Sequence, residues 1–437
     1  MDRRVVITGI GAVTPLGLDA PSTWEALKAG TNGIGPITRF DTEEFKVKVA
    51  AEVKGFDPLR YLTKQEVRHT DLNVQYAIAA SDEALADAGL VIEGDKVAAG
   101  LAGAEGRSEQ APEARPEANI AAERVGTYIG SGIGGFITMY EQITLFNERG
   151  PRRVSPFMVP MMIANMATGE VSIRHHATGP TLPVVTACAT SSHTVGEAFH
   201  AIRLGTADAI LAGGTESPIL PVSVAAFQNA MALTKNPDPQ TACRPFDDGR
   251  DGFVMGEGAV VLVLEELGHA LARGAKVYAE VVGYGNTADA YHITSPDPDA
   301  DGITRAIRVA CDEAGVDPSE GLYINAHGTS TKLNDASETK GFKRALGEDA
   351  ARSAKISSSK SMTGHMLGAT GAMEAMVCAL TLRDGVVTPT IHLVDADPDC
   401  DLDYTPDVAV PFDARWALST SLGFGGHNAC LAFRKYE

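Results

Sequence analysis

The sequence lacks the features that mark disulfide-stabilised, zinc-binding and membrane-spanning proteins. Its six cysteines are scattered, with no Cys-X-X-Cys pair and no zinc-ligand spacing, which predicts reduced thiols and no metal site. No apolar run approaches the ~18 residues of a membrane span, and the short run that follows Met1 is too brief for a signal peptide. These absences predict a soluble, cytoplasmic protein.

Positive charge is also scarce. The chain has 37 Lys and Arg against 56 Asp and Glu, which gives a formal net charge of −19. This balance argues against nucleic acid or an anionic membrane as the main partner, because both attract basic surfaces. With 437 residues, of which 44% are hydrophobic, the chain has enough apolar content for a large core.

Short apolar runs alternate with segments of helical spacing, a pattern typical of buried strands and helices in an α/β fold. The pattern divides near residues 267–274 into two similar halves, 1–266 and 267–437, and predicts an internal duplication packed as two mixed sheets with helices between and outside them. The predicted strands are residues 4–9, 124–130, 183–187, 209–213 and 259–264, then 277–283, 322–325, 355–358, 417–422 and 429–433.

One stretch breaks this pattern. Residues 93–123 consist mainly of Ala, Glu, Gly, Pro and Arg, with almost no large apolar side chains. We expect a surface insertion there that contributes nothing to the core.

One cysteine and two histidines occur in loops rich in small residues. Cys188 lies between a predicted strand and a predicted helix, where the helix dipole favours the thiolate and free backbone N–H groups can bind an oxyanion. His327 follows the strand at 322–325, and His365 lies between Gly364 and Gly368. A thiol with two imidazoles can hold an acyl group while a second reactant is activated.

Each of these residues also has a simpler interpretation. A free cysteine is most often a small buried core residue. A lone histidine is more often a hydrogen-bonded structural residue than a catalyst, and that interpretation is kept for His69, His175, His176, His200 and His269.

The motifs around these three residues carry a resemblance to a known family. Thr186-Ala187-Cys188-Ala189, Asn325-Ala326-His327-Gly328-Thr329 and Gly364-His365-Met366 occur in this order, followed by Gly423-Phe424-Gly425-Gly426. The chain thereby resembles the elongating β-ketoacyl-acyl carrier protein synthases over almost its whole length. The resemblance implies a thiolase-like fold, with two duplicated βαβαβαββ halves forming an α-β-α-β-α sandwich.

The resemblance also implies roles for particular residues. Cys188 corresponds to the acyl-accepting nucleophile, and His327 and His365 to the pair that decarboxylates the malonyl group. Phe424 corresponds to the gate over the acyl tunnel, and its backbone N–H, with that of Cys188, to the oxyanion hole. The other implied residues are Lys360 and Glu374 as a buried ion pair, Asp335 in a supporting loop, Thr329, Thr331, His292 and Thr294 around the substrate, and Ile133 and Met158 in the tunnel wall.

The implied reaction is a decarboxylative condensation of an acyl thioester with malonyl-acyl carrier protein in type II fatty-acid elongation. The family is usually a homodimer and needs no metal or redox cofactor, because its substrates carry phosphopantetheine. The implied docking residues for the carrier protein are Lys64, Arg68, Arg152 and Arg153. Met231 stands where the family often has a basic docking residue, and Met158 where it often has an aromatic one.

Other functions fit parts of this pattern. A polyketide ketosynthase subunit uses the same three residues, and a non-catalytic chain-length-determining subunit keeps the fold but typically lacks the nucleophile, which Cys188 supplies here. A cysteine hydrolase would explain neither His365 nor Phe424. Chain-length preference and the choice between fatty-acid and secondary metabolism stay open at this point.

Overall fold

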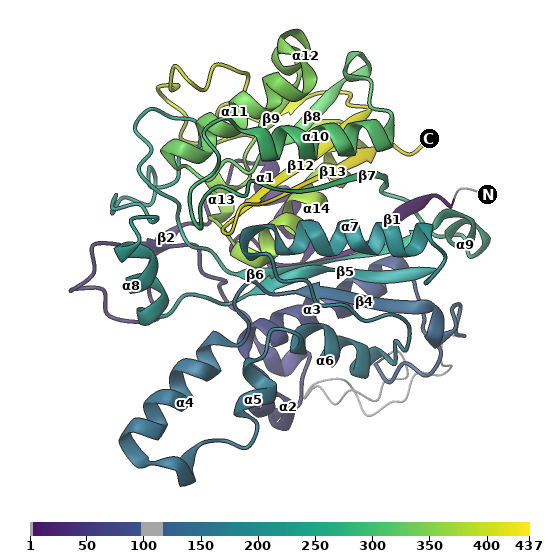
Figure 1. Ribbon diagram of the computed structural model, residues 1–437. Helices are drawn as coiled ribbons and strands as arrows, with labels where there is room; N and C mark the ends of the chain where they lie inside the picture. The colour runs from purple at the N-terminus through teal and green to yellow at the C-terminus, as the bar shows by residue number, and fades with distance from the viewer. Residues whose placement is uncertain (1–2, 98–116) are drawn as a thin grey trace.

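The computed structural model describes residues 3–97 and 117–437 and has a mixed α/β architecture (Figure 1). Nine strands form one hydrogen-bonded sheet in the order β4-β5-β6-β1-β7-β13-β12-β8-β9. Their bounds are β1 (Val5–Val13), β4 (Val125–Gly130), β5 (Ala209–Glu216), β6 (Gly258–Glu266), β7 (Ala279–Ala288), β8 (Leu322–Asn325), β9 (Lys355–Ser357), β12 (Trp416–Gly423) and β13 (His427–Arg434).

The two ends of this sheet repeat one pattern of strand directions. In the first, β4 is parallel to β5, and β5, β6 and β1 are successively antiparallel. In the second, β8 is parallel to β12, and β12, β13 and β7 are successively antiparallel. The two groups join where residues 5–7 of β1 pair with residues 279–281 of β7.

Two helices lie between the two groups of strands. They are α7 (Thr190–Arg203) and α14 (Thr370–Asp384), and each contacts strands of both groups (Figure 1). Every residue of α14 from Thr370 to Leu382 is buried, as expected for a helix that has packing partners on all sides. The side chains of both helices join strand residues from both groups in the largest hydrophobic cluster.

The outer faces are covered by α3 (Leu72–Ala88) on β1 and β6, and by α10 (Asp301–Ala314) on β7 and β13. In α10, Ile303, Ala306, Ile307 and Ala310 form a buried stripe at helical spacing. The succession of helix, strand, helix, strand and helix layers agrees with the layered α/β prediction.

Both outer helices rest directly on glycines. A Cβ on Gly11 of β1 would lie 1.9 Å from the carbonyl oxygen of Ala80 in α3. In the same way, a Cβ on Gly285 of β7 would lie 1.9 Å from the carbonyl oxygen of Ala306 in α10. Only glycine allows helix and strand to approach this closely.

The remaining elements are short or lie at the periphery. The helices are α1 (Ala20–Lys28), α2 (Lys64–His69), α4 (Phe136–Arg149), α5 (Met158–Met162), α6 (Met166–His175), α8 (Pro221–Asn229), α9 (Leu267–Ala272), α11 (Lys332–Leu346), α12 (Glu348–Ser353) and α13 (Lys360–Thr363). The 3-10 turns are η1 (Pro58–Arg60), η2 (Ala122–Arg124), η3 (Pro151–Arg153), η4 (Ala187–Ala189), η5 (Pro318–Glu320) and η6 (Leu367–Ala369). Two small hairpin sheets pair β2 (Gly35–Pro36) with β3 (Val49–Ala50) and β10 (Val386–Val387) with β11 (Val410–Pro411).

All six cysteines are free thiols, and five of them are buried, as the scattered spacing predicts. Among residues 3–97 and 117–437, every helix is too short or too polar to cross a membrane.

Nine of the ten predicted strands are present, and the structure corrects two details. The predicted strand at residues 183–187 is wrong: the chain there makes one isolated bridge, between Thr181 and Thr127, and then enters η4. The segment runs along the edge of β4, where no further strand of the described chain pairs with it. The prediction of two separate sheets is also wrong, because the contact between β1 and β7 joins all nine strands.

The predicted insertion at 93–123 is only partly described. Residues 98–116 lie outside the described residues. The expectation that the whole stretch avoids the core is wrong at its C-terminal end, because Ile120 and Ala122 are buried against α3 and neighbouring strands. A bridge between Ile92 and Ile120 closes the base of the segment.

The glycine contacts make a stability prediction. We expect Gly285→Ala to lower the free energy of unfolding by about 1–3 kcal/mol, because its Cβ would meet the α10 backbone and force the helix away from β7. Gly169→Ala in α6 is the control: a Cβ there meets nothing within 4 Å, and alanine favours a helix. Denaturant unfolding followed by circular dichroism measures both, and equal midpoints for the two variants would contradict the contact argument.

Candidate active site

Cys188 lies in η4, immediately before α7, so the predicted helix after it is present whereas the predicted strand before it is not. The preceding Ala187 has a φ of 52°, a left-handed conformation that is strained for a residue with a Cβ. The Thr190 hydroxyl accepts a 2.9 Å hydrogen bond from the backbone N–H of Thr186 and so closes this turn. The kink fixes the direction in which the thiol leaves the backbone.

The thiol is 9% exposed and packs in an apolar cluster with Phe253, Leu367 and Ile133. Burial raises the pKa of the Cys188 thiol to about 11, so the prediction of a thiolate in the resting protein is wrong. Three groups act in the opposite direction: the Lys360 charge and the backbone N–H groups of Phe424 and of Cys188 itself. The same two N–H groups are the predicted oxyanion hole, and they stabilise negative charge at this position.

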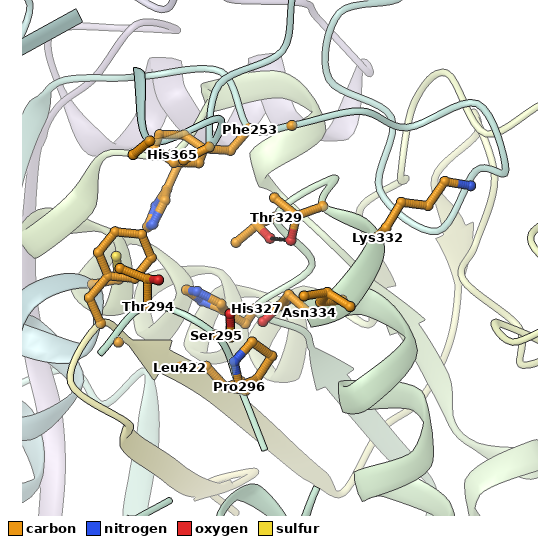
Figure 2. Close-up of a pocket in the computed structure, with 18 of the residues that line it drawn as sticks. Phe253, Thr294, Ser295, Pro296, His327, Thr329, Lys332, Asn334, His365 and Leu422 are labelled. Atoms are coloured by element: carbon orange, nitrogen blue, oxygen red, sulfur yellow. Dashed lines mark hydrogen bonds between the residues drawn. The ribbon is translucent and has the colours of Figure 1, made fainter. Parts of the chain in front are cut away.

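His327 and His365 face the same cavity as Cys188, which has a volume of about 440 Å³ (Figure 2). Their ring centroids are 5.3 Å apart with the planes nearly perpendicular. His365 Nδ1 lies 3.0 Å from the Thr370 hydroxyl at the start of α14. His365 Nε2 and His327 Nδ1 are buried and have no hydrogen-bond partner within the described chain. Both nitrogens are therefore available to hydrogen-bond a molecule in the cavity.

Both imidazoles are neutral at physiological pH. Burial, followed by the positive charge of Lys360, holds the pKa of His365 well below its usual value. The pKa of His327 is lowered by burial, by Lys360 and by His365. A neutral imidazole keeps one N–H donor and one acceptor nitrogen, so the pair can donate hydrogen bonds to an oxyanion without carrying charge.

Lys360 and Glu374 form the ion pair that the resemblance implies. Their side chains are 0% exposed, and Lys360 Nζ bonds Glu374 Oε1. Burial raises the pKa of Glu374, whereas the Lys360 charge lowers it. Lys360 begins α13 and Glu374 lies on α14, so the pair ties both ends of the His365 loop to the core. Removal of one partner from such a pair typically costs about 3–5 kcal/mol.

Glu338 is a site residue that the sequence interpretation missed. Its buried carboxylate on α11 accepts hydrogen bonds from the backbone N–H groups of His327 (2.6 Å) and Gly328 (2.8 Å) and from the Thr420 hydroxyl (2.5 Å). It thereby fixes the His327 turn between β8 and β12. The sequence carries no signal for it, because its role depends on α11, which places it one turn beyond Asp335.

The cavity is lined on one side by Thr329 and on another by Phe424. Thr329 and Thr331 share a 2.9 Å hydrogen bond between their hydroxyls, drawn as a dashed line in Figure 2. The Phe424 turn is held by a 2.8 Å hydrogen bond from the Gly425 N–H to the carbonyl of Ile293. Gly425 has a φ of 88°, which glycine adopts without strain.

Other predicted substrate residues occupy different positions. Thr294 lines the cavity, whereas His292 is exposed and orients Thr294 by accepting its backbone N–H at 3.1 Å. Ile133 packs in the Cys188 cluster outside the described cavity, and Met158 is half-buried at the start of α5. The roles of these residues stay predictions.

Asp335 lies away from the cavity and is fully buried. Its Oδ2 is 3.3 Å from Arg250 Nε and accepts the Phe246 N–H at 2.9 Å. Arg250 also donates to the carbonyls of Thr331 and Lys332, so this pair fixes the backbone of the Thr329–Thr331 turn. Asp335 is therefore placed to support the loop rather than to contact a substrate.

The predicted docking residues lie on two surface elements. Lys64 and Arg68 are exposed on α2, and Arg152 and Arg153 are exposed on η3. The ring of His69 in α2 stacks on the ring of Phe157, with 3.9 Å between the centroids, so α2 contacts the residue that precedes α5. Within the described ranges, no group of three or more His, Cys, Asp or Glu side chains is arranged so that it could hold a metal ion.

The electrostatic argument makes a prediction about ionisation. Lys360→Met removes the positive charge beside the histidines, so we expect the pKa of His365 to rise toward its usual value. Carbon-13 NMR titration of labelled histidines measures this shift. Lys355→Met, a charge removed from the nearby strand β9, is the control and leaves the titration unchanged. An unaltered His365 titration in Lys360→Met would contradict the argument.

The site can be compared with known proteins. Residues 2–270 match the family description "Beta-ketoacyl synthase, N-terminal domain", and residues 278–394 match "Beta-ketoacyl synthase, C-terminal domain". The chain is 50% identical over 436 residues to a protein named 3-oxoacyl-[acyl-carrier-protein] synthase 2 from Staphylococcus aureus, with 100% of this chain and 99% of that protein covered.

Two further relatives extend the comparison. A protein of the same name from Synechocystis is 47% identical, with 100% of this chain and 99% of that protein covered. A solved structure described as the ishigamide ketosynthase/chain length factor is 35% identical with a TM-score of 0.87, and each chain is covered completely. With matching family descriptions along most of its length, the chain belongs to the β-ketoacyl synthase family.

Proposed function

We propose that the protein condenses an acyl group held on Cys188 with the malonyl group of malonyl-acyl carrier protein and so elongates the acyl chain by two carbons. The observation that carries this proposal is the meeting of a buried thiol and two buried neutral imidazoles, each with an unpartnered nitrogen, in one cavity. The relatives named 3-oxoacyl-[acyl-carrier-protein] synthase 2 support the same assignment.

The first step transfers the acyl group to Cys188. The sulfur attacks the carbonyl of the incoming thioester, a new carbon–sulfur bond forms, and the bond to the pantetheine sulfur breaks. The Cys188 proton leaves through a neutral imidazole and reaches the departing thiol. Because burial raises the thiol pKa, the thiolate forms only as attack proceeds, stabilised by Lys360 and by the Phe424 N–H.

The second step releases carbon dioxide from the malonyl thioester. The electron pair of the breaking carbon–carbon bond moves toward the thioester oxygen and forms an enolate. When His365 Nδ1 accepts a hydrogen bond from the Thr370 hydroxyl, His365 Nε2 carries the ring proton. Nε2 then donates a hydrogen bond to the enolate oxygen. His327 supplies the second donor, and both act in a water-poor cavity where such hydrogen bonds are strong.

The enolate carbon then attacks the acyl-Cys188 carbonyl. The tetrahedral oxyanion lies in the field of the Cys188 and Phe424 N–H groups, the carbon–sulfur bond breaks, and the Cys188 thiolate takes a proton from solvent. The Thr329–Thr331 turn is placed to bind the pantetheine arm through its hydroxyls. We infer that Phe424 gates the acyl side, with its flanking glycines taking up the movement.

The proposed partner is an acidic acyl carrier protein, docked on Lys64, Arg68, Arg152 and Arg153. A formal net charge of −19 repels such a partner at long range, so these local basic residues supply the attraction. Met231 lines the cavity and is 77% exposed. It would contact the carrier protein through apolar atoms at a position where the family often has a basic residue. The six free cysteines support the proposed cytoplasmic location.

We further propose that residues 1–266 and 267–437 are duplicated halves. The matching strand directions support this, and so does the packing of the outer helices. Gly9 and Gly11 face the carbonyls of Ala84 and Ala80, and the second half repeats this spacing with Gly283 and Gly285 against Ala310 and Ala306. Under this relation α7 corresponds to α14, and the turn at Cys188 to the turn at Lys360.

The reaction predicts different losses for two Cys188 variants. Cys188→Ser abolishes condensation, because the hydroxyl is a much weaker nucleophile than a thiolate. Cys188→Gln abolishes acylation but still releases carbon dioxide from malonyl-acyl carrier protein, because the amide resembles the acylated side chain and leaves both histidines in place. Carbon dioxide release and product mass measure the two half-reactions.

The same assay separates the alternative functions. Acyl-carrier proteins of graded length give a single two-carbon extension per cycle in fatty-acid elongation, and repeated extension to a poly-β-keto chain in polyketide synthesis. Normal acyl labelling of Cys188→Ser at its native rate would remove Cys188 from the mechanism. Failure of the native protein to release carbon dioxide would overturn the proposed condensation.

We also propose that two copies of the chain form a homodimer through the edge segment 182–186. Leu182 and Val185 in this extended segment are 41% and 51% exposed. An unpaired extended segment with apolar side chains is an aggregation risk unless another strand covers it, and a second copy related by a two-fold axis covers it symmetrically.

This interface predicts the effect of one charge. Val185→Lys places an ammonium group in the proposed interface, so we expect it to shift the protein from dimer to monomer at micromolar concentration. Val408→Lys, at a site 69% exposed and remote in sequence, is the control and leaves the mass unchanged. Light scattering after size-exclusion chromatography measures both, and a monomeric native protein would exclude the proposed dimer.

A further inference from the structure

A second buried carboxylate lies beside the site and has no role in the reaction described above. Glu216 ends strand β5 and is 0% exposed. Within the described chain, no Lys, Arg or His forms an ion pair with it. A buried carboxylate without a cation needs strong hydrogen bonds in compensation.

Four donors supply this compensation, and they come from two different loops. The first loop, between β4 and α4, contributes the Ser131 hydroxyl (2.7 Å), the Gly132 N–H (2.8 Å) and the Ile133 N–H (3.2 Å). The second loop, which follows His365, contributes the Gly368 N–H (3.0 Å). One carboxylate therefore joins two loops that are more than 200 residues apart in the sequence.

Both loops contribute an apolar side chain to the cluster around Cys188, which lies beside the described cavity. Ile133 from the first loop and Leu367 from the second pack in the same hydrophobic cluster as the Cys188 thiol. A displacement of Glu216 would therefore move the Ile133 and Leu367 side chains together.

The carboxylate has almost no freedom to shift. A Cβ on Gly132 would lie 2.8 Å from Glu216 Oε2, and a Cβ on Gly368 would lie 2.7 Å from the same oxygen and 2.4 Å from the Gly132 nitrogen. The two loops and the carboxylate thus pack backbone against side chain with no intervening space. Such close packing is expected of a group that holds the two loops at a fixed separation.

We propose that Glu216 is a positioning residue that sets the shape of the acyl-binding space beside Cys188 and thereby the preferred length of the acyl chain. The inference rests on the proposed function, because it assigns an acyl chain to this apolar space. Glu216 acts through the backbone of Gly132, Ile133 and Gly368 and does not itself contact the substrate.

Glu216→Gln tests this role with little change in volume. Oε1 accepts from Ser131 and Ile133, and Oε2 accepts from Gly132 and Gly368. The amide has one accepting oxygen and one donating nitrogen. Its nitrogen is best placed toward Ser131, whose hydroxyl can accept, so the Ile133 N–H loses its acceptor. The variant therefore removes the hydrogen bond that holds the Ile133 backbone and keeps those of Gly132 and Gly368.

The measurement is the alkylation of Cys188 by two maleimides, N-ethylmaleimide and N-decylmaleimide, followed by intact mass. The ratio of the two rates cancels any change in thiol ionisation and reports the apolar space alone. We expect this ratio to change by about fivefold or more in Glu216→Gln, because small changes in an apolar pocket alter selectivity by such factors. The acyl-length profile of Cys188 acylation from acyl-carrier proteins shifts in the same direction.

Glu265→Gln is the matched control. Glu265 is also fully buried, and it lies at the opposite end of the β5–β6 pair, where it faces Ala209 and bonds Thr8 and Arg273. Its variant loses stability but keeps the maleimide ratio. If Glu216→Gln does not fold, Gly132→Ala replaces it, because its Cβ displaces Oε2 from the loop side.

The outcomes separate this proposal from the proposed function. A changed ratio in Glu216→Gln or Gly132→Ala with an unchanged ratio in Glu265→Gln supports the positioning role. A native ratio in the Glu216 and Gly132 variants, or an equal change in Glu265→Gln, overturns it. The maleimide ratio needs neither carrier protein nor condensation, so a failed condensation assay of the native protein overturns the proposed function without deciding this result.

Discussion

The first turns of α7 and α14 touch at Gly371 and Ser192, and this contact determines how the reactive groups meet. A Cβ on Gly371 would lie 2.1 Å from the Ser192 hydroxyl oxygen. The Ser191 hydroxyl accepts the Ala372 N–H at 2.8 Å, which joins the same two turns a second time. Because Cys188 precedes α7 and His365 precedes α14, the helix contact places thiol and imidazole at one cavity.

Burial between the two groups of strands then decides the charge of each group in the cavity. It is the largest influence on the pKa of Cys188, His327 and His365, and in each case it favours the neutral form. Lys360 is the positive charge that acts on all three, and it lowers each of these pKa values. One buried cation therefore keeps the imidazoles uncharged and makes the thiolate more accessible during attack.

The sequence predicts the parts of this arrangement that depend on local pattern. Apolar runs place nine strands correctly, and the motif order singles out Cys188 and both histidines, which the fold brings to one cavity. Local pattern cannot reveal contacts that close only in three dimensions. Glu338 and Glu216 each sit in otherwise ordinary segments, and their function as backbone anchors depends on donors from distant loops. The raised pKa of Cys188 was missed for the same reason, because burial depends on packing from all sides.

The failed strand prediction at 183–187 has a structural cause in the fold itself. In the second group of strands, β9 pairs with β8 and leads into Lys360. The corresponding segment before Cys188 bridges β4 only at Thr181, although its sequence is equally strand-like. The apolar pattern depends on the sequence alone. A regular β-ladder also needs a partner strand, and this segment has none on the side that faces away from β4 in the described chain. The first group of strands therefore keeps an open edge, within the described chain, three residues from Cys188, so any strand that pairs there also supports the strained turn that aims the thiol.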